Sequence, residues 1–235
     1  MEAAQRSVGA VPRLHTLRVF CAEDGTGGNP LGVFLQGAEV PAERRQAVAA
    51  DLGFSETVFV EDAARGAIRI HTPAVELDFA GHPSVGAAWL IARERARVES
   101  LIVPAGEVGV RWEGEVPFVS ARPAWGPPWE LEQLPGPAAV EGLDGPPHGG
   151  DLVVAWAWID EVAGSMRARA FGERIGIAED EATGSAATKL CALAGRPVEI
   201  RQGTGSRLLA RPADDGFVEI GGASAVDDVR DYTPP

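Results

Sequence analysis

Two helical patterns, one in each half of the chain, constrain the fold more than any other feature. Apolar residues recur at the i, i+3, i+4, i+7 spacing of a helix in two places. These positions are Val85, Ala88, Trp89 and Ala92 in the first half, and Ala187, Leu190, Cys191 and Ala194 in the second. Each pattern starts just after a run of small residues, GHPS at 81–84 and ATGS at 182–185. The layout predicts two similar halves, each built around one helix of small residues.

Short strands are expected around both helices, because segments rich in β-branched or aromatic residues alternate with Gly, Pro or acidic turns. They are expected at 14–20, 32–35, 57–60, 68–72, 101–103 and 108–112, and then at 152–159, 166–171, 197–200, 207–211 and 217–220. A further helix is expected over 41–52, ended by Gly53. The fold class is α+β, with two pseudo-symmetric lobes, each a sheet or barrel wrapped around a central helix.

Residues 122–150 separate the two halves and are crowded with Pro, Gly and Trp. Such a stretch is not expected to hold a regular strand ladder, and it marks a lobe boundary or an ordered surface connection. We expect an N-terminal lobe over 1–116, a C-terminal lobe over 117–222, and a C-terminal segment over 223–235 that can return to the first lobe.

The charge balance excludes several classes of partner. Asp and Glu number 34 against 21 Lys and Arg, so the net charge is −13. This field repels phosphate backbones and anionic lipid surfaces, and we expect neither nucleic-acid nor membrane binding. A small anion can still bind at a helix terminus. The opening residues MEAAQRSVGAVPR lack an apolar segment, which favours a cytoplasmic protein.

The cysteines and the one lysine argue against bound cofactors. Cys21 and Cys191 are far apart and have no metal-ligand spacing around them, so neither a disulfide framework nor a zinc site is expected. Pyridoxal phosphate and phosphate-loop chemistry both need a suitably placed lysine. Lys189 is the only lysine, and it falls inside a predicted helix with no glycine-rich loop before it. We expect no cofactor and no metal.

Four clusters combine a polar side chain with residues that allow tight turns: 28–30, 55–57, 80–83 and 179–185. Small residues at a helix start expose the free N–H groups of its first turn, which together with the helix dipole favour a carboxylate. Two such helix ends facing each other can bind one anion from both sides. Beside a carboxylate base, they can also stabilise an enolate-like charge as it develops.

Four segments closely resemble the signature segments of the PhzF-like family of phenazine biosynthesis. They are GGNPLGVF, FSETVFVED, IRIHTPAVELDFAGHPSVGAA and GIAEDEATGSAA, in the family's order. The resemblance implies the diaminopimelate-epimerase-like fold, which agrees with the two-half layout. It also implies a cofactor-independent isomerase that acts on a small carboxylate-bearing substrate. Family members commonly pair, so a homodimer is expected.

The resemblance also implies roles for individual residues. Glu56 matches the family's proton-shuttling glutamate, His82 its site histidine, and Asp180 its aspartate; these are the expected catalytic residues. The expected substrate-binding residues are Asn29, Gly81, Gly184 and Ser185, with the two glycines donating backbone amides to the carboxylate.

One base is expected rather than two. The true epimerases that share this layout use two cysteines at the starts of the two helices, and those positions carry no cysteine here. We expect Glu56 to move a proton on its own, with its pKa raised by burial between the lobes. Departures from the family pattern at His71, Asp78 and Glu181, and a short second lobe, leave the substrate open.

Two alternatives stay open at this point. One is a binding protein that retains the carboxylate site but has lost catalysis. The other is a hydrolase that uses Ser185 or Ser55 with His82 and Asp180, although the chain lacks the Gly-x-Ser-x-Gly turn typical of such enzymes.

Overall fold

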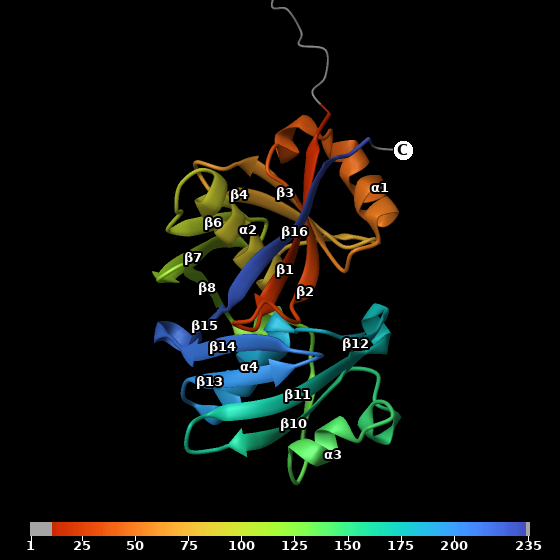
Figure 1. Ribbon diagram of the computed structural model, residues 1–235, viewed down its shortest axis with the longest axis vertical. Coiled ribbons are helices and arrows are strands. Elements are labelled where there is room, and N and C mark those ends of the chain that lie inside the picture. The colour runs from red at the N-terminus through yellow and green to blue at the C-terminus, as the bar shows by residue number, and fades with distance from the viewer. Residues whose placement is uncertain (1–10, 234–235) are drawn as a thin grey trace, which may run out of the picture.

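The computed structural model describes residues 11–233 and shows two lobes along the long axis of the molecule (Figure 1). The first lobe contains β1 (Arg13–Cys21), β2 (Asn29–Phe34), α1 (Ala42–Leu52), β3 (Thr57–Asp62), β4 (Ala67–His71), β5 (Glu76–Leu77), α2 (Gly81–Glu94), β6 (Ser100–Val103), β7 (Gly106–Glu113) and β16 (Ala223–Asp231). β8 (Val116–Ala121) pairs with β7 and with β15 and so connects the lobes.

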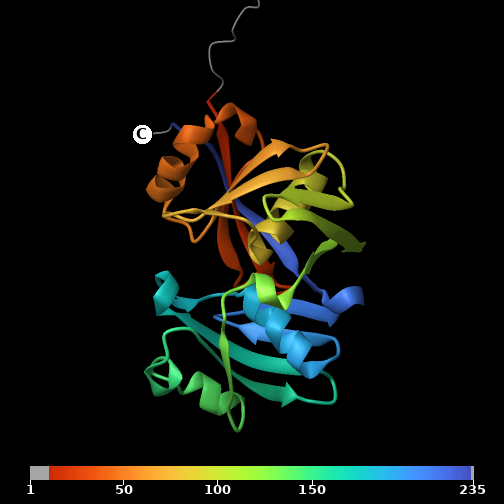
Figure 2. The same ribbon diagram turned by 180° about the vertical axis from the view of Figure 1, so that it is seen from behind.

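The second lobe contains β9 (Glu130–Gln133), α3 (Pro137–Glu141), β10 (Val153–Asp160), β11 (Ser165–Gly172), β12 (Ile177–Asp180), α4 (Gly184–Ala194), β13 (Val198–Gln202), β14 (Ser206–Pro212) and β15 (Val218–Gly221). Short 3-10 turns lie at 37–39, 123–125, 147–149, 173–175 and 214–216. Seen from behind, α4 lies against the lower sheet with its start at the junction of the lobes (Figure 2). Within residues 11–233, no helix is both long and apolar enough to cross a bilayer.

The two lobes repeat one topology. In the first, β2 and β3 are parallel across α1, β3 and β4 form an antiparallel pair, and β4 and β6 are parallel across α2. In the second, β9 and β10 are parallel across α3, β10 and β11 form an antiparallel pair, and β11 and β13 are parallel across α4. A short side strand lies in sequence between this sheet strand and the central helix in each lobe: β5 pairs with β4, and β12 pairs with β11. The repeat confirms the expected α+β fold.

The central helices are buried because their residues are small. Along α2, every residue from Gly81 to Ala88 is buried, and the α4 residues Ala186, Ala187, Leu190 and Cys191 are also buried. A Cβ added to Gly86 would lie 2.6 Å from Leu31 and 2.8 Å from Val19, so the sheet packs directly on the helix backbone there. Apolar burial of this kind stabilises a fold in proportion to the area removed from water.

The segment 122–150 is more regular than expected. The expectation that it holds no strand ladder is wrong, because β9 pairs with β10 in parallel and α3 forms the crossover between them. The residues of β9, ELEQ, lack Pro and Gly. The guanidinium of Arg169 donates to the carbonyls of Val140 and Leu143, which fastens the crossover to the sheet. The glycines and prolines that flank β9 and α3 led the sequence analysis to miss this strand and helix.

The chain returns to the first lobe at its end, where β16 pairs antiparallel with β1 from Arg13 and Asp231 to Cys21 and Ala223. The N-terminal residues 1–10, on which the expectation of a cytoplasmic protein partly rests, lie outside the described residues. The loop after β1 also contacts the second lobe: the Gly28 amide donates to Ser206 Oγ at 2.8 Å. The neighbouring Gly27 lies directly against the backbone of Gly205 and Ser206.

We expect Gly27→Ala to destabilise the protein more than Gly25→Ala. Both glycines have positive φ, +65° and +80°, so an alanine at either position costs about 1–2 kcal/mol. A methyl group added at Gly27 would clash with the backbone of the second lobe, whereas one added at Gly25 would meet nothing within 4 Å. Gly27→Ala should therefore cost about 1–3 kcal/mol more. Urea unfolding of both variants measures the difference. Equal losses would show that the lobes do not rely on this contact.

Candidate active site

The starts of α2 and α4 meet at the junction of the lobes. A Cβ added to Gly81 would lie 3.4 Å from the Cα of Gly184, and one added to Gly184 would lie 3.3 Å from the Cα of Gly81. Neither N-cap residue, Ala80 or Thr183, caps its helix with a side chain. The first-turn amides of both helices therefore lack a side-chain acceptor, and both positive dipole ends point to one place.

Glu56 and His82 lie together beside these helix starts. Glu56 directly precedes β3, and His82 is the second residue of α2. Glu56 Oε2 and His82 Nε2 are 3.4 Å apart, with side-chain exposures of 14% and 8%. The geometry falls short of a hydrogen bond, so both atoms are buried without a hydrogen-bond partner among the described residues. Such atoms are costly to bury and commonly mark a place that a ligand or a proton will occupy.

Burial raises the pKa of Glu56, because a carboxylate is poorly solvated there. The nearby Ser55 hydroxyl partly offsets the rise. Its Oγ is nevertheless outside hydrogen-bond geometry with any described residue. A carboxyl group with a raised pKa can both take and return a proton near neutral pH. This is the property expected of Glu56 from the sequence.

Burial also lowers the pKa of His82 to about 4, and the Asp180 carboxylate and a hydrogen bond to the Pro30 carbonyl only partly oppose the shift. His82 is therefore neutral at pH 7. Because Nε2 has no partner, the bond to Pro30 uses Nδ1–H. The remaining lone pair on Nε2 faces Glu56, and it can accept a proton from that carboxyl group but gives no donor to a carboxylate.

Asp180 lies at the end of β12, with both oxygens bonded. Asn29 Nδ2 donates to Oδ1 and Thr183 Oγ1 donates to Oδ2, each at 2.7 Å. Burial is the largest influence on this carboxyl group and raises its pKa, while the bonds from Thr183 and Asn29 and the nearby His82 oppose the rise. Asn29 also donates to the Ala182 carbonyl, so its amide hydrogens are used in holding the Asp180 turn.

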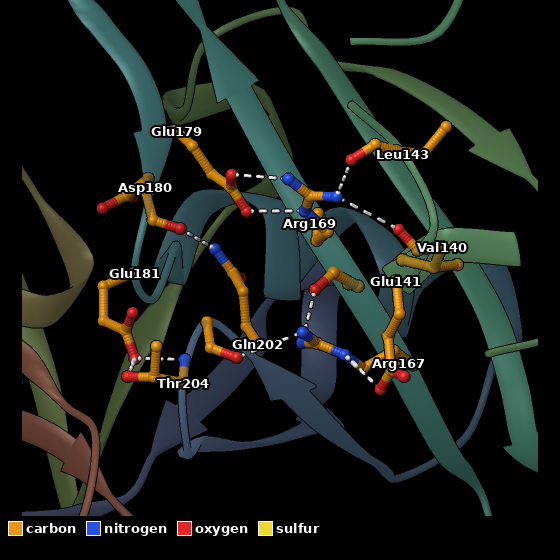
Figure 3. A network of polar contacts seen from close by, with 12 residues as sticks. Val140, Glu141, Leu143, Arg167, Arg169, Glu179, Asp180, Glu181, Gln202 and Thr204 are labelled. Carbon is orange, nitrogen blue, oxygen red and sulfur yellow. Dashed lines mark hydrogen bonds and ion pairs between the residues drawn. The ribbon is translucent and has the colours of Figure 1, made fainter. Parts of the chain in front are cut away.

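Gln202 completes this turn, and nothing in the sequence patterns indicated it. It is 2% exposed, and its amide donates to the Asp180 carbonyl at 2.7 Å and to Thr183 Oγ1 at 2.8 Å. Its Oε1 accepts from the Thr183 amide at 3.2 Å. The Thr183 hydroxyl hydrogen must then point to Asp180. Figure 3 shows the bond between Gln202 and Asp180.

Ser185, the second residue of α4, is contacted by the segment between the lobes. Trp129 Nε1 donates to Ser185 Oγ at 2.9 Å. A Cβ added to Gly126 would lie 2.6 Å from the Ser185 Cβ, so the segment passes directly over this side chain. No role was assigned to Trp129 from the sequence, and its single indole hydrogen is the signal that could have suggested a polar role.

Three departures from the family pattern lie away from the Glu56–His82 pair. The His71 ring packs edge-on against Phe59 and contacts Gln46 of α1. Asp78 is exposed. Glu181 Oε1 accepts hydrogen bonds from Thr204 and Ser206. Of these, only Glu181 acts near the junction of the lobes, through the Ser206 hydroxyl that also accepts from Gly28.

An open pocket of about 500 Å³ is lined by Asp180 and, among others, by Arg167, Arg169, Glu179 and Glu181. Figure 3 shows its two guanidinium groups. Arg169 is engaged by Glu179 and two carbonyls, and Arg167 by three carbonyls and Glu141. These arginines hold the crossover and the β13–β14 turn in place. Within residues 11–233 no cluster of three or more His, Cys, Asp or Glu could hold a metal ion.

Only one lobe has an acid at the position of Glu56. Thr57 begins β3 and pairs with Gly32 and His71, while Val153 begins β10 and pairs with Glu130 and Phe171. The repeat therefore matches Glu56 with Leu152, a buried apolar residue that is 4% exposed. The two N-cap positions hold Ala80 and Thr183, and Cys21 and Cys191 are buried elsewhere with raised pKa values.

Solved structures place this architecture in the class of epimerase-like α+β proteins. A PhzF-family phenazine biosynthesis protein of Bacillus anthracis matches with a TM-score of 0.78 and 16% identity, covering 94% of this chain and 99% of that one. A hydroxyproline epimerase of Agrobacterium vitis matches with a TM-score of 0.59 and 12% identity, covering 93% and 91%. The expected fold is thus confirmed.

The sequence comparisons narrow the class to one family. The family model of phenazine biosynthesis-like proteins, PhzC-PhzF, matches residues 17–117. The trans-2,3-dihydro-3-hydroxyanthranilate isomerase of Pseudomonas aeruginosa is 31% identical, over 84% of this chain and 91% of that protein. An uncharacterized isomerase of Pasteurella multocida is 44% identical over 84 residues, 34% of this chain and 29% of that protein. The chain belongs to the PhzF family, and its type of activity is isomerisation.

We expect the stability of the protein to depend on pH through His82. Its folded-state pKa of about 4 lies below the ordinary 6.5, so the unfolded chain binds the proton more readily. Stability from neutral His82 is present above pH 6.5 and is lost as pH falls towards 4, by up to about 3 kcal/mol. His82→Asn should remove this part of the pH dependence.

Urea unfolding of wild type and His82→Asn between pH 4 and 8 measures the effect. Burial also lowers the pKa of His15 and His71, so the prediction concerns the difference between the two proteins. Curves that stay parallel across this range would contradict it.

Proposed function

We propose that Glu56 carries out a one-base proton shift on a small carboxylate-bearing substrate held between the starts of α2 and α4. One observation carries the proposal: a carboxyl group with a raised pKa and a buried, unpaired Oε2 stands beside two converging helix N-termini. The helix ends suit a carboxylate, and the carboxyl group suits proton transfer.

The step needs no net change in atoms. Glu56 as carboxylate takes a proton from a carbon next to a double bond conjugated with the substrate's carboxylate. The electrons of that C–H bond move into the conjugated system and place enolate-like charge on the substrate carboxylate. The amides at the two helix starts stabilise this charge as it develops. Glu56 then returns its proton to a different carbon, which forms the isomer and restores the carboxylate.

His82 and Asp180 are proposed to support this transfer. The free lone pair of His82 Nε2 can accept a hydrogen bond from protonated Glu56 between the two half-steps. Asp180, held by Asn29 and Thr183, places a carboxylate near both groups and disfavours a second negative charge there. Positioned acid–base catalysis of this kind contributes about 10²–10⁴-fold to the rate.

The asymmetry of the two lobes supports one base. An epimerase that works from both faces of a carbon needs an acid–base group on each side. Here the position matching Glu56 is Leu152, and the two N-cap positions carry Ala80 and Thr183. A single group that removes and returns the same proton fits this arrangement better.

Two observations support the proposed substrate class: the helix N-termini favour a carboxylate, and a relative is named for a compound that carries one. The Pseudomonas aeruginosa relative is named for trans-2,3-dihydro-3-hydroxyanthranilate, a small unsaturated ring acid. We propose a substrate of this kind for the present chain. Backbone amides of Gly81 and Gly184, with Ser185, are proposed to bind its carboxylate.

A serine hydrolase is less well supported. Among the described residues, no hydrogen bond joins Ser185 or Ser55 to His82, and Ser185 Oγ accepts from Trp129 instead. A nucleophile without a base beside it is not activated. A binding protein without catalysis would keep the same site, and the Glu56 experiment below separates it from an isomerase.

A cytoplasmic location and a homodimer are also proposed. Both cysteines are free and buried, which suits a reducing compartment. The pairing expected from the family resemblance can be measured by sedimentation. The net charge of −13 supports the absence of nucleic-acid and anionic-membrane partners.

We expect Glu56→Gln to lower turnover by at least about 10²-fold while the protein still folds. The reaction can be followed by proton NMR in deuterated water with trans-2,3-dihydro-3-hydroxyanthranilate, where isomerisation and deuterium incorporation are both visible. Asn29→Ser, which removes the hydrogen bonds to Asp180 and to the Ala182 carbonyl but leaves Glu56 in place, should lose less. A fully active Gln variant would remove Glu56 from the mechanism, and binding by wild type without exchange would favour the binding protein.

The same variant has an expected effect on stability. Because the pKa of Glu56 is raised, the folded state is more stable while Glu56 is protonated and loses stability as pH rises through the folded-state value. Glu56→Gln should therefore be more stable than wild type at pH 8 and no more stable at pH 4. Urea unfolding at both pH values tests this, and a variant less stable at pH 8 would contradict a buried, costly carboxylate.

A further inference from the structure

Ser185 receives a hydrogen bond that can run in one direction only. The indole Nε1–H of Trp129 is a donor and never an acceptor, and it lies 2.9 Å from Ser185 Oγ. The oxygen of Ser185 must accept this bond. Its own hydrogen is then left to point elsewhere.

Other hydroxyl groups on the two helices use their hydrogens inside the helix. Ser84 Oγ donates to the Ala80 carbonyl, and Thr188 Oγ1 donates to the Ser185 carbonyl, both at 2.7 Å. Such back-bonding is common for Ser and Thr in helices. Between residues 11 and 233, the Ser185 hydroxyl donates to no group, although it stands in the first turn of α4.

The tryptophan is held firmly enough to enforce this orientation. Trp129 is 7% exposed, and its backbone amide donates to the Pro127 carbonyl at 2.8 Å. On the far side its ring packs closely on Gly172, where an added Cβ would lie 3.2 Å from it. Gly126 presses on the Ser185 Cβ from the same segment. The indole is therefore held against Ser185 by its backbone and by its ring contact.

We propose that Trp129 is a positioning residue that fixes Ser185 as a hydrogen-bond donor to the substrate's carboxylate. The inference rests on the proposed function. It also orients the substrate, because the second residue of α2 offers a hydrogen-bond acceptor whereas the second residue of α4 offers a donor. His82, whose Nδ1–H is bonded to Pro30, offers Nε2 as an acceptor beside Glu56. Ser185, whose oxygen accepts from Trp129, offers its hydroxyl hydrogen at the start of α4. The carboxylate is placed at α4 and the reacting carbons face Glu56.

The test is a double-mutant cycle on carboxylate binding. The probe is 3-hydroxyanthranilate, the stable aromatic counterpart of the compound for which the relative is named. Its affinity is measured by calorimetry for wild type, Trp129→Phe, Ser185→Ala and the double variant. Trp129→Phe keeps the ring and removes the donor, and it should weaken binding about five- to tenfold. In the Ser185→Ala background, the same change should have almost no effect.

Trp125→Phe is the matched control. Trp125 lies in the same segment, packs against Phe79 and Phe217, and is 38% exposed. It should leave affinity unchanged. A loss for Trp129→Phe that persists in the Ser185→Ala background would assign Trp129 to packing and overturn the inference, as would unchanged affinity in Trp129→Phe. Absence of binding by wild type would overturn the proposed function and the inference together.

Discussion

The contact between Gly81 and Gly184 is the constraint on which the rest of the site depends. The two helix starts are in close backbone contact: a Cβ added to Gly184 would lie 3.3 Å from the Gly81 Cα, and one added to Gly81 would lie 2.6 Å from the Ile220 side chain that covers both. With glycine at both, two positive helix ends lie next to each other inside a protein whose net charge is −13. Two like dipole ends at such short range favour an anion between them. This is the physical basis of the carboxylate site proposed above.

Neighbouring groups that can only donate or only accept a hydrogen bond decide which site atoms are donors and which are acceptors. The Pro30 carbonyl can only accept, so His82 presents a bare Nε2 to Glu56. Gln202 donates to the Thr183 hydroxyl, whose hydrogen then goes to Asp180. Both Asp180 oxygens therefore accept hydrogen bonds from neighbouring side chains. Buried polar networks of this kind rigidify a site when every member is satisfied. The Asp180 turn is satisfied in this way, whereas Glu56 Oε2 and His82 Nε2 beside it are buried without a hydrogen-bond partner among the described residues.

Much of the fold could be predicted from the sequence, because local patterns encode local structure. The two central helices, the helix over Ala42–Leu52 and most strands follow from periodicity and turn residues within a few positions. The strands β5, β8, β12 and β16 were not predicted. β12 and β16 are rich in charged residues, and their pairing is decided by the strands they meet, β11 and β1. The segment 122–150 was misjudged because its flanking prolines hide a short regular unit.

The sequence by itself determined which side chains are available to the site: one glutamate before a strand, and a histidine and a serine that each follow a glycine at a helix start. Only the tertiary structure decided what each of them faces. Asn29 meets Asp180 across 151 residues and Trp129 meets Ser185 across 56. No local pattern carries that information, because a hydrogen-bond donor finds its acceptor through the packing of whole lobes. Burial, which raises the pKa values of Glu56 and Asp180 and lowers that of the neighbouring His82, arises from the same packing.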